Sequence, residues 1–256
     1  MTIFAATDKT AIVAELRANR LLLAGGSYFN AAALTDDYLY RKLLAAESDA
    51  ARRLRVLFEP TTIFAGEPSA DEILAVGTSP WLEEAAYDYE PALWNPEDWG
   101  YMVLRNPLVS SIASIEFVYP SPVSGIFKIP DNWIRLDKKA GHVRFVPAGS
   151  SMSIGAFGSM ILSMMSGGRN VPQMIKVRYI AGMANAARDY PDLIDLINKM
   201  AVLRIIEDTF VPQSGSISAD GLSQSFSADV DKFKDALDKK LEALRDAIHG
   251  VRCMVM

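Results

Sequence analysis

The chain has 256 residues, of which 50% are hydrophobic and 22% charged, enough for one large domain or two smaller ones with ordinary cores. Its formal net charge of −5 argues against a protein that binds nucleic acid by neutralising phosphates. A single cysteine, Cys253, excludes an internal disulfide and a cysteine-based zinc cluster and indicates a reducing compartment. No secretory signal is expected, because the first residues lack a basic region followed by an apolar one.

The first part of the chain is predicted to be helical. One helix is expected over residues 8–23, where a glycine pair ends it. A second starts at Thr35, whose hydroxyl can cap the first turn, and Asp36 and Asp37 favour the positive helix end. It is expected to run to Pro60. Its apolar positions follow a spacing of three to four: Leu39, Leu43, Ala46, Ala50, Leu54 and Leu57. Residues 1–66 are therefore predicted to be the N-terminal helices of a helical body.

Residues 67–100 are predicted to form an acidic, aromatic strap. Between Arg55 and Arg105 there is no lysine or arginine, and the acids there are Glu59, Glu67, Asp71, Glu72, Glu83, Glu84, Asp88, Glu90, Glu97 and Asp98. Trp81, Trp94 and Trp99 stand among them, which is typical of an ordered segment and not of an acidic tail. Two interpretations stay open: a solvated loop with buried aromatics, or a surface that faces a basic partner.

Residues 101–180 are predicted to form an inserted β domain. Apolar residues alternate with polar ones at Ile115 and Phe117, Ile134 and Leu136, Val143 and Phe145, and Val177 and Tyr179. Such strands indicate an antiparallel sheet with one solvated face, on which Lys176 and Arg178 would lie. An uncharged loop rich in Met, Gly and Ser, residues 147–168, has an apolar middle too short to span a bilayer. It is covered either by its own chain or by a neighbouring subunit.

Residues 181–250 are predicted to return to helices. Pro191 suits a helix start, and the helix that follows has apolar residues on nearly every side, so it needs either a large domain or a second copy of the chain to cover it. Residues 214–227 suggest a small hairpin around Asp220 and Gly221. A last helix, residues 228–248, carries one apolar stripe. Residues 251–256 are left as a C-terminal docking tail.

The sequence offers no recognisable reactive centre. His142 and His249 are the only histidines, and neither has partners at metal-ligand spacing. The phosphate loop, the dinucleotide-binding turn, the zinc-protease motif and the nucleophile elbow are absent. We therefore expect no catalytic residue, no cofactor and no bound metal. The last four residues, from Cys253 to Met256, match a prenylation pattern, but an apolar tail that docks on a partner explains them as well.

The order of the segments resembles the head-tail connector, or adaptor, proteins of tailed bacteriophages. A helix, LLAAESDAARRLRVLFEPTTI, leads to the strap and strands WNPEDWGYMVLRNPLVSSIASIEFVYPSP and IPDNWIRLDKKAGHVRFVP, then to IKVRYIAGM and a helix. In that family an α-helical, ring-forming body carries a β insertion. A strand, an R-Y-x-A-G passage, a proline and an apolar helix follow the insertion; here the matching residues are Arg178, Tyr179, Ala181, Gly182 and Pro191. The longer strap and the Met-rich loop depart from compact family members.

The resemblance implies an α+β fold, with a helical ring-forming body and an inserted antiparallel β domain. It implies a structural protein, not an enzyme, that forms a homo-oligomeric ring of twelve copies in the virion neck. The ring would join the portal protein to the tail or a second neck protein, line the channel through which DNA passes, and assemble in the host cytoplasm without a membrane.

Two groups of residues are predicted to make the contacts. The subunit interface is expected at apolar residues of the two C-terminal helices: Leu193, Ile197, Met200, Leu203, Ile206, Phe233, Leu237 and Leu241. The portal-docking tail is expected to use Val251, Arg252, Met254, Val255 and Met256.

Three alternatives remain at this stage. The chain could form another virion ring, such as a tail terminator or a baseplate component. It could be an enzyme with an unrecognised site built from Asp and Ser residues. It could associate with membranes through the Met-rich loop or a lipidated Cys253.

Overall fold

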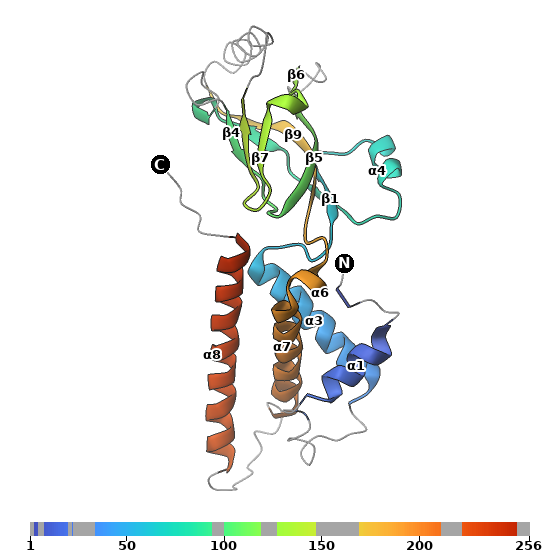
Figure 1. Cartoon of the computed structure of the whole chain (residues 1–256), viewed down its shortest axis with the longest axis vertical. Helices are drawn as coiled ribbons and strands as arrows, with labels where there is room; N and C mark the ends of the chain where they lie inside the picture. The colour runs from blue at the N-terminus through green and yellow to red at the C-terminus, as the bar shows by residue number, and fades with distance from the viewer. Residues whose placement is uncertain are drawn as a thin grey trace. The chain divides into compact units, whose positions relative to one another are not determined.

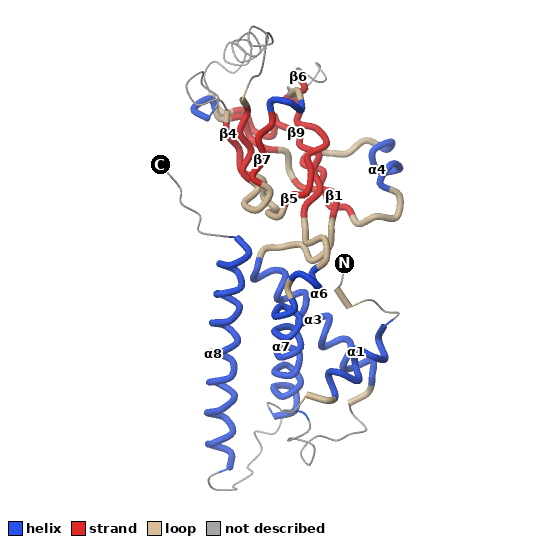
Figure 2. The backbone as a smooth tube through the Cα atoms, viewed as in Figure 1, coloured by secondary structure: helices blue, strands red, loops and turns tan. Residues whose placement is uncertain are grey.

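The computed structural model of the chain describes residues 3–4, 8–19, 22, 34–93, 100–118, 127–146, 169–210 and 222–249. Helices and two β-sheets are both present, so the predicted α+β class is confirmed (Figures 1 and 2). The chain divides into two compact units. The helical unit comprises Met1–Phe58 and Asn185–Ile248, and the β unit comprises Glu59–Ala184 with His249–Met256.

The helical unit is built from segments at both ends of the chain. Its helices are α1 (Lys9–Arg17), α3 (Asp36–Leu54), α6 (Ala186–Asp189), α7 (Pro191–Phe210) and α8 (Leu222–His249). The long helix α8 runs back alongside α7 (Figure 1). The predicted start of α7 at Pro191 is confirmed.

Helix α3 begins where the sequence predicts it. The Thr35 hydroxyl accepts a hydrogen bond from the Tyr38 amide at 3.3 Å, and five of the six predicted stripe residues are fully buried. The helix ends at Leu54, before Pro60, because Arg55 adopts a left-handed backbone with φ of 54° that closes the last turn. Leu57, the sixth, therefore lies outside the helix.

Helix α8 begins at Leu222, which corrects the predicted hairpin at residues 214–227. Residues 222–227 are helical, while residues 214–221 lie outside the described part of the chain. A hairpin of Ser and Gln has few apolar side chains to bury, so nothing in this segment favours a strand pair over extension of the adjoining helix.

The β unit contains a six-stranded and a three-stranded sheet. In the first, the order is β2-β1-β9-β5-β6, and β3 also pairs with β9. Its strands are β1 (Thr61–Ala65), β2 (Trp81–Glu84), β3 (Tyr87–Tyr89), β5 (Val109–Phe117), β6 (Phe127–Lys128) and β9 (Val171–Ala181). The second sheet has the order β4-β8-β7, with β4 (Tyr101–Val103), β7 (Ile134–Asp137) and β8 (His142–Phe145). Short helices are α4 (Ala70–Val76), η2 (Pro91–Leu93) and η3 (Asp131–Trp133).

The strands predicted after Tyr101 form, and they pair with one another in antiparallel fashion. The turn between β7 and β8 is held by Asp137, whose side chain accepts hydrogen bonds from the amides of Lys139 and Ala140. The six-stranded sheet as a whole is nevertheless mixed, because β1 and β2 pair in parallel.

Strand β1 was predicted as part of the N-terminal helical segment, and this prediction is wrong. Ile63, Phe64 and Ala65 are all buried, so the strand lacks the alternation that marks a half-buried strand. β1 lies between β2 and β9, and the β unit accordingly starts at Glu59 instead of after residue 66.

The predicted strap, residues 67–100, is not simply extended. It contains α4, β2, β3 and η2, and residues 94–99, with Trp94, lie outside the described chain, as does the Met-rich loop. A capping box starts α4: the Ser69 hydroxyl accepts from the Glu72 amide at 3.2 Å, and the Glu72 carboxylate accepts from the Ser69 amide at 2.8 Å.

Candidate functional site

The residues predicted to form the subunit interface are core residues of the helical unit. Seven of the eight are buried within a single chain, with exposed fractions of 0 to 8%: Leu193, Ile197, Met200, Leu203, Ile206, Leu237 and Leu241. Phe233 is half-buried. A second copy is therefore not needed to cover α7, so its apolar surface is no argument for a ring, and the ring stays a prediction.

Helix α7 is covered because its own chain surrounds it. Ion pairs join α7 to α3 through Arg204 and Asp49, and α8 to α7 through Lys234 and Glu207. A central helix of a bundle is apolar on most sides for this reason. The sequence pattern is the same for a central helix and for a helix buried between subunits, so it could not separate the two.

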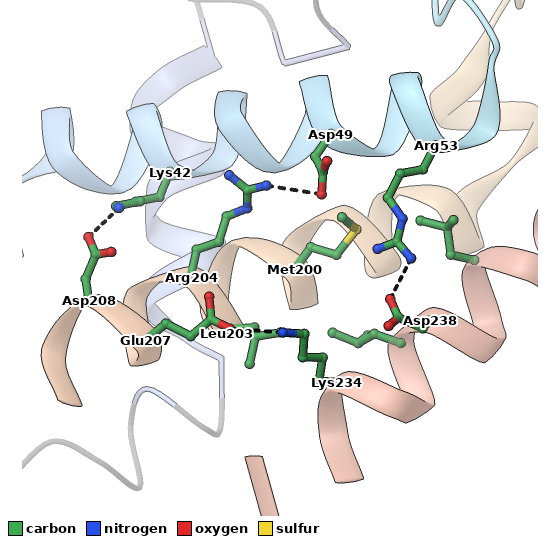
Figure 3. A pocket seen from close by; sticks show the side chains of 12 residues that line it. Lys42, Asp49, Arg53, Met200, Leu203, Arg204, Glu207, Asp208, Lys234 and Asp238 are labelled. Carbon is green, nitrogen blue, oxygen red and sulfur yellow. Dashed lines mark hydrogen bonds and ion pairs between the residues drawn. The ribbon is translucent and has the colours of Figure 1, made fainter. Parts of the chain in front are cut away.

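A groove of about 370 Å³ lies among α3, α7 and α8 (Figure 3). Its four basic side chains face its four acidic side chains in ion pairs: Lys42 with Asp208, Arg204 with Asp49 at 3.1 Å, Arg53 with Asp238 at 2.7 Å, and Lys234 with Glu207 at 3.9 Å. The hydrogen bond from Lys42 lowers the pKa of Asp208 below its ordinary value. Since each charge in the groove already has a counterion, the groove holds the three helices together and offers no unpaired charge to a ligand.

In the β unit, Arg178 on β9 is buried, although the sequence placed it on a solvated face. Its exposed fraction is 9%, and its guanidinium binds both carboxylate oxygens of Glu72, at 2.7 and 3.2 Å. It also donates to the carbonyl oxygens of Ala65, Gly66 and Glu67 at 3.0 to 3.1 Å. One buried cation therefore ties β9 to the end of β1 and to α4.

The carboxyl group of Glu72 is held in its charged form by this contact. The hydrogen bond from Arg178 lowers the pKa of Glu72, against the opposing effect of burial. Glu72 stands at the third helical position after Ser69, so the capping-box spacing S-x-x-E was the signal in the sequence that could have found it.

Arg178 continues a row of side chains across one face of the sheet. Its guanidinium lies 5.2 Å from the centre of the Phe64 ring, and Phe64 packs edge-on against Trp81 with centroids 5.9 Å apart. The register agrees, because Arg178 pairs with Phe64 and Trp81 pairs with Thr62, two residues away on the same face. The row Glu72–Arg178–Phe64–Trp81 thus links α4 to β2.

The opposite face carries a cluster around Glu84. One carboxylate oxygen of Glu84 accepts hydrogen bonds from the hydroxyls of Tyr179 at 2.9 Å and Tyr87 at 3.0 Å. The other accepts one from the side-chain amide of Asn106 at 3.2 Å. The Tyr87 hydroxyl accepts from the Arg105 amide at 2.9 Å, and the Arg105 guanidinium lies 4.1 Å from the centre of the Tyr87 ring. We call these five residues the Glu84 cluster.

The two tyrosine hydroxyls of the Glu84 cluster stay protonated and uncharged near neutral pH. Burial raises the pKa of Tyr179 to about 12 and the pKa of Tyr87 further above its ordinary value. Tyrosines with raised pKa values are poor nucleophiles and poor bases near neutral pH. Both oxygens of Glu84 are occupied by donors, so the cluster anchors the chain between β2 and β3.

These two sets of contacts hold β2 at the edge of the six-stranded sheet, where it carries two exposed apolar side chains. Among the described residues, the large apolar side chains that are exposed all belong to the β unit: Ile73, Leu74, Trp81, Leu82, Leu93 and Val103. Trp81 and Leu82 are 38% and 39% exposed and are followed by the exposed Glu83. We call Trp81, Leu82 and Glu83 the β2 edge; it is the candidate functional site.

The remaining predicted positions do not assemble into a reactive centre in the described part of the chain. The His142 ring packs edge-on against Tyr101 with centroids 5.7 Å apart, and His249 ends α8. Among the described residues, no group of His, Cys, Asp and Glu has the arrangement of a metal site. No helix in that part of the chain is long and apolar enough to cross a bilayer. The portal-docking tail lies outside the described residues and stays a prediction.

Comparison of the sequence with models of protein families and with curated proteins finds no match.

Proposed function

We propose that the chain is a structural head-to-tail connector of a tailed phage virion. In this proposal its copies form a ring in the virion neck, which joins the portal to the tail or to a second neck protein. The ring lines a channel for DNA and assembles in the host cytoplasm. The proposal makes the helical unit the ring-forming body and the β unit its inserted domain.

The observation that carries the proposal is the order in which the chain builds its units. Residues 1–58 and 185–248 form one helical unit, and the chain between them forms the β unit. This is the arrangement that the resemblance to connectors implies. The R-Y-x-A-G passage lies at the end of β9, directly before the chain enters the second helical segment.

Within that passage the structure gives Arg178 and Tyr179 architectural roles. Arg178 fixes α4, and Tyr179 belongs to the Glu84 cluster. Both lock the β unit next to the point where the chain leaves it. Buried hydrogen-bonded side chains of this kind rigidify the structure around them, as a scaffold requires.

The burial of α7 changes which surfaces the ring would use. Contacts between copies, or with neck partners, are better assigned to the β unit, where the exposed apolar side chains lie, than to the helical core. The net charge of −5 is compatible with a channel wall along which DNA slides without binding.

Electron microscopy of the purified protein mixed with the portal protein of the same virion tests the proposal. We expect closed rings bound to the portal. Particles that stay monomeric and separate from the portal would overturn the proposal, and binding to the tail tube in place of the portal would favour a tail-terminator ring.

A matched variant tests the docking tail. A chain that ends at Gly250 should keep its fold, measured by circular dichroism, and lose portal binding in a pull-down, because an apolar tail can add as an extended segment to a partner. If the shortened chain binds the portal as well as the full chain does, the tail has no part in docking.

A further inference from the structure

We propose that the β2 edge binds an extended, positively charged segment of a partner protein as an added β-strand. This surface goes beyond the connector role, and binding to it can be measured on the isolated chain whether or not the chain forms a ring.

The first step is the backbone of β2. In the described part of the chain, β2 pairs only with β1, so it is an edge strand of the six-stranded sheet. The carbonyl oxygens of Pro80 and Glu84 accept hydrogen bonds from the amides of Thr62 on β1 and of Gly66 directly after it. Because strand groups alternate in direction, the backbone groups of Trp81 and Glu83 face away from β1. They are the groups that an added strand would pair with.

The second step is the composition of this edge, which is short and carries two glutamates but contains no lysine and no proline. Edge strands are normally blunted by lysines, prolines, bulges or covering segments. β2 reads Trp-Leu-Glu-Glu, without lysine or proline, and Trp81, Leu82 and Glu83 are all exposed. A rigid edge with an exposed tryptophan and leucine is suited to a partner, because these side chains supply contact area with little loss of freedom.

The third step is the rigidity of the edge. Trp81 packs on Phe64, which in turn packs under the Arg178 guanidinium bound to Glu72. On the other face, Glu84 is fixed by Tyr87 and Tyr179. The edge is therefore held in place before any partner arrives, which lowers the entropic cost of binding.

The fourth step is the charge of the segment that contains β2, which determines the kind of partner that can bind. From Val56 to Leu104 the chain has ten acids and no lysine or arginine. Of these acids, Glu72 and Glu84 are engaged by Arg178 and by the Glu84 cluster. Glu67, Asp71, Glu83, Asp88 and Glu90 are exposed. Of these, Glu83 lies on the edge itself, and an exposed carboxylate there favours a basic strand and repels an acidic one.

The register gives the pattern of the partner. Trp81 and Glu83 lie on one face of the sheet, and Leu82 lies on the other. Cations on one face of the added strand would lie beside Trp81 and Glu83, and apolar side chains on the other face would lie beside Leu82. The structure thus selects a segment in which basic and apolar residues alternate.

The test uses the full chain and a fluorescent, end-capped peptide of alternating lysine and valine, with binding measured by anisotropy. We expect saturable binding, and no binding of the matched peptide of alternating glutamate and valine. Glu83→Pro should weaken binding about tenfold or more, because proline removes an outward amide donor that β1 does not use and an edge strand tolerates proline. Glu83→Lys should also weaken it, whereas Glu242→Lys on the exposed face of α8 should leave it unchanged.

Circular dichroism and thermal unfolding of each variant establish that the β unit is folded. Equal binding of the two peptides, or lysine–valine binding that Glu83→Pro leaves unchanged, would overturn the inference. So would self-association of the chain, seen by sedimentation, that Glu83→Pro abolishes, because the edge would then pair with a second copy. None of these results depends on portal binding, so failure here is distinguishable from failure of the connector role.

Discussion

Two adjacent residues of β9 show how single side chains fix the β unit. Arg178 reaches one face of the sheet and binds Glu72, while Tyr179 reaches the other face and binds Glu84. The alternation of the strand is what sends neighbouring side chains to opposite faces. Each residue therefore fixes a different part of the segment between β1 and β4, and substitutions at the two positions should have separable effects.

Tyr179→Phe should destabilise the β unit by about 1–2 kcal/mol, because it removes a buried hydroxyl that donates to Glu84 and accepts from Asn106. Unfolding in denaturant measures the change, and Tyr101→Phe on β4, outside the Glu84 cluster, is the control.

The contribution of Tyr179 to stability also depends on pH, with a definite sign. The pKa of Tyr179 is raised from 10.0 to about 12 in the folded chain, so the stability it contributes is present below pH 10 and is lost as pH rises to about 12. Tyr179→Phe should reduce this alkaline loss; an unchanged alkaline profile would contradict the assignment.

Glu72→Gln should change the acid side of the profile. The pKa of Glu72 is lowered from its ordinary 4.5 by the hydrogen bond from Arg178, so the unfolded chain takes up the proton first as pH falls. The stability from this contact is present above pH 4.5 and is lost as pH falls through the lower folded pKa. The glutamine variant should be less stable at neutral pH and should lose less stability on acidification. Urea unfolding at several pH values measures both effects, and parallel curves for variant and wild type would refute them.

At the scale of elements, α8 is attached to the rest of the helical unit by an apolar stripe and by ion pairs. The two contribute very different free energies. Leu237, Leu241 and Leu244 are buried, whereas Arg53 and Asp238 have side chains 40% and 42% exposed. Exposed pairs contribute about 0–1 kcal/mol, and a buried leucine contributes several times more. Burial of the stripe must therefore dominate the attachment of α8.

Leu241→Ala is expected to cost about 2–4 kcal/mol, and Asp238→Asn less than about 1 kcal/mol. Thermal unfolding followed by circular dichroism compares the two, with high salt as an additional probe of the ion pair. Salt should lower the unfolding temperature of the wild type only slightly. A loss from Asp238→Asn as large as that from Leu241→Ala would mean that the charges, and not the stripe, attach the helix.

The elements that could be predicted from sequence are those whose signals are local. α3 has Thr35 as its cap and a regular stripe, and the hairpin of β7 and β8 has Asp137 at its turn. β1 could not be recognised by alternation because Ile63, Phe64 and Ala65 are buried on both faces. The capping box at Ser69 was visible but short, and only the contact with Arg178, 106 residues from Glu72, shows what it supports.

At the scale of the whole molecule, the sequence predicted the class of fold but not what covers α7. The side chains of α7 are apolar on most sides because α3 and α8 of the same chain enclose it, and periodicity carries no information on which chain supplies the cover. The candidate site could not be predicted from the sequence either. The β2 edge is exposed because of the way β1 and β9 pair with other strands, and this pairing cannot be read from the sequence. The lack of lysine and arginine between Arg55 and Arg105, in contrast, could be read from the sequence alone.

Each of the two units has its own buried core, which leads to a prediction about the chain as a whole. Leu43 on α3 and Ile115 on β5 are both fully buried, one in each unit. Leu43→Ala and Ile115→Ala should each cost about 2–5 kcal/mol in the unit that carries the change. Substitutions in separate cores share no partners, so in the double variant each unit should lose the same stability as in the single variant, to within about 0.5 kcal/mol.

Hydrogen exchange of individual amides locates these losses. Leu43→Ala should speed exchange in α3 and α7 and leave β9 protected, and Ile115→Ala should do the reverse, because domains with separate cores open separately. Faster exchange in β9 caused by Leu43→Ala would show that the units unfold as one. In that case the helical unit and the β unit would share their stability, and a partner bound at the β2 edge would also stabilise the helices.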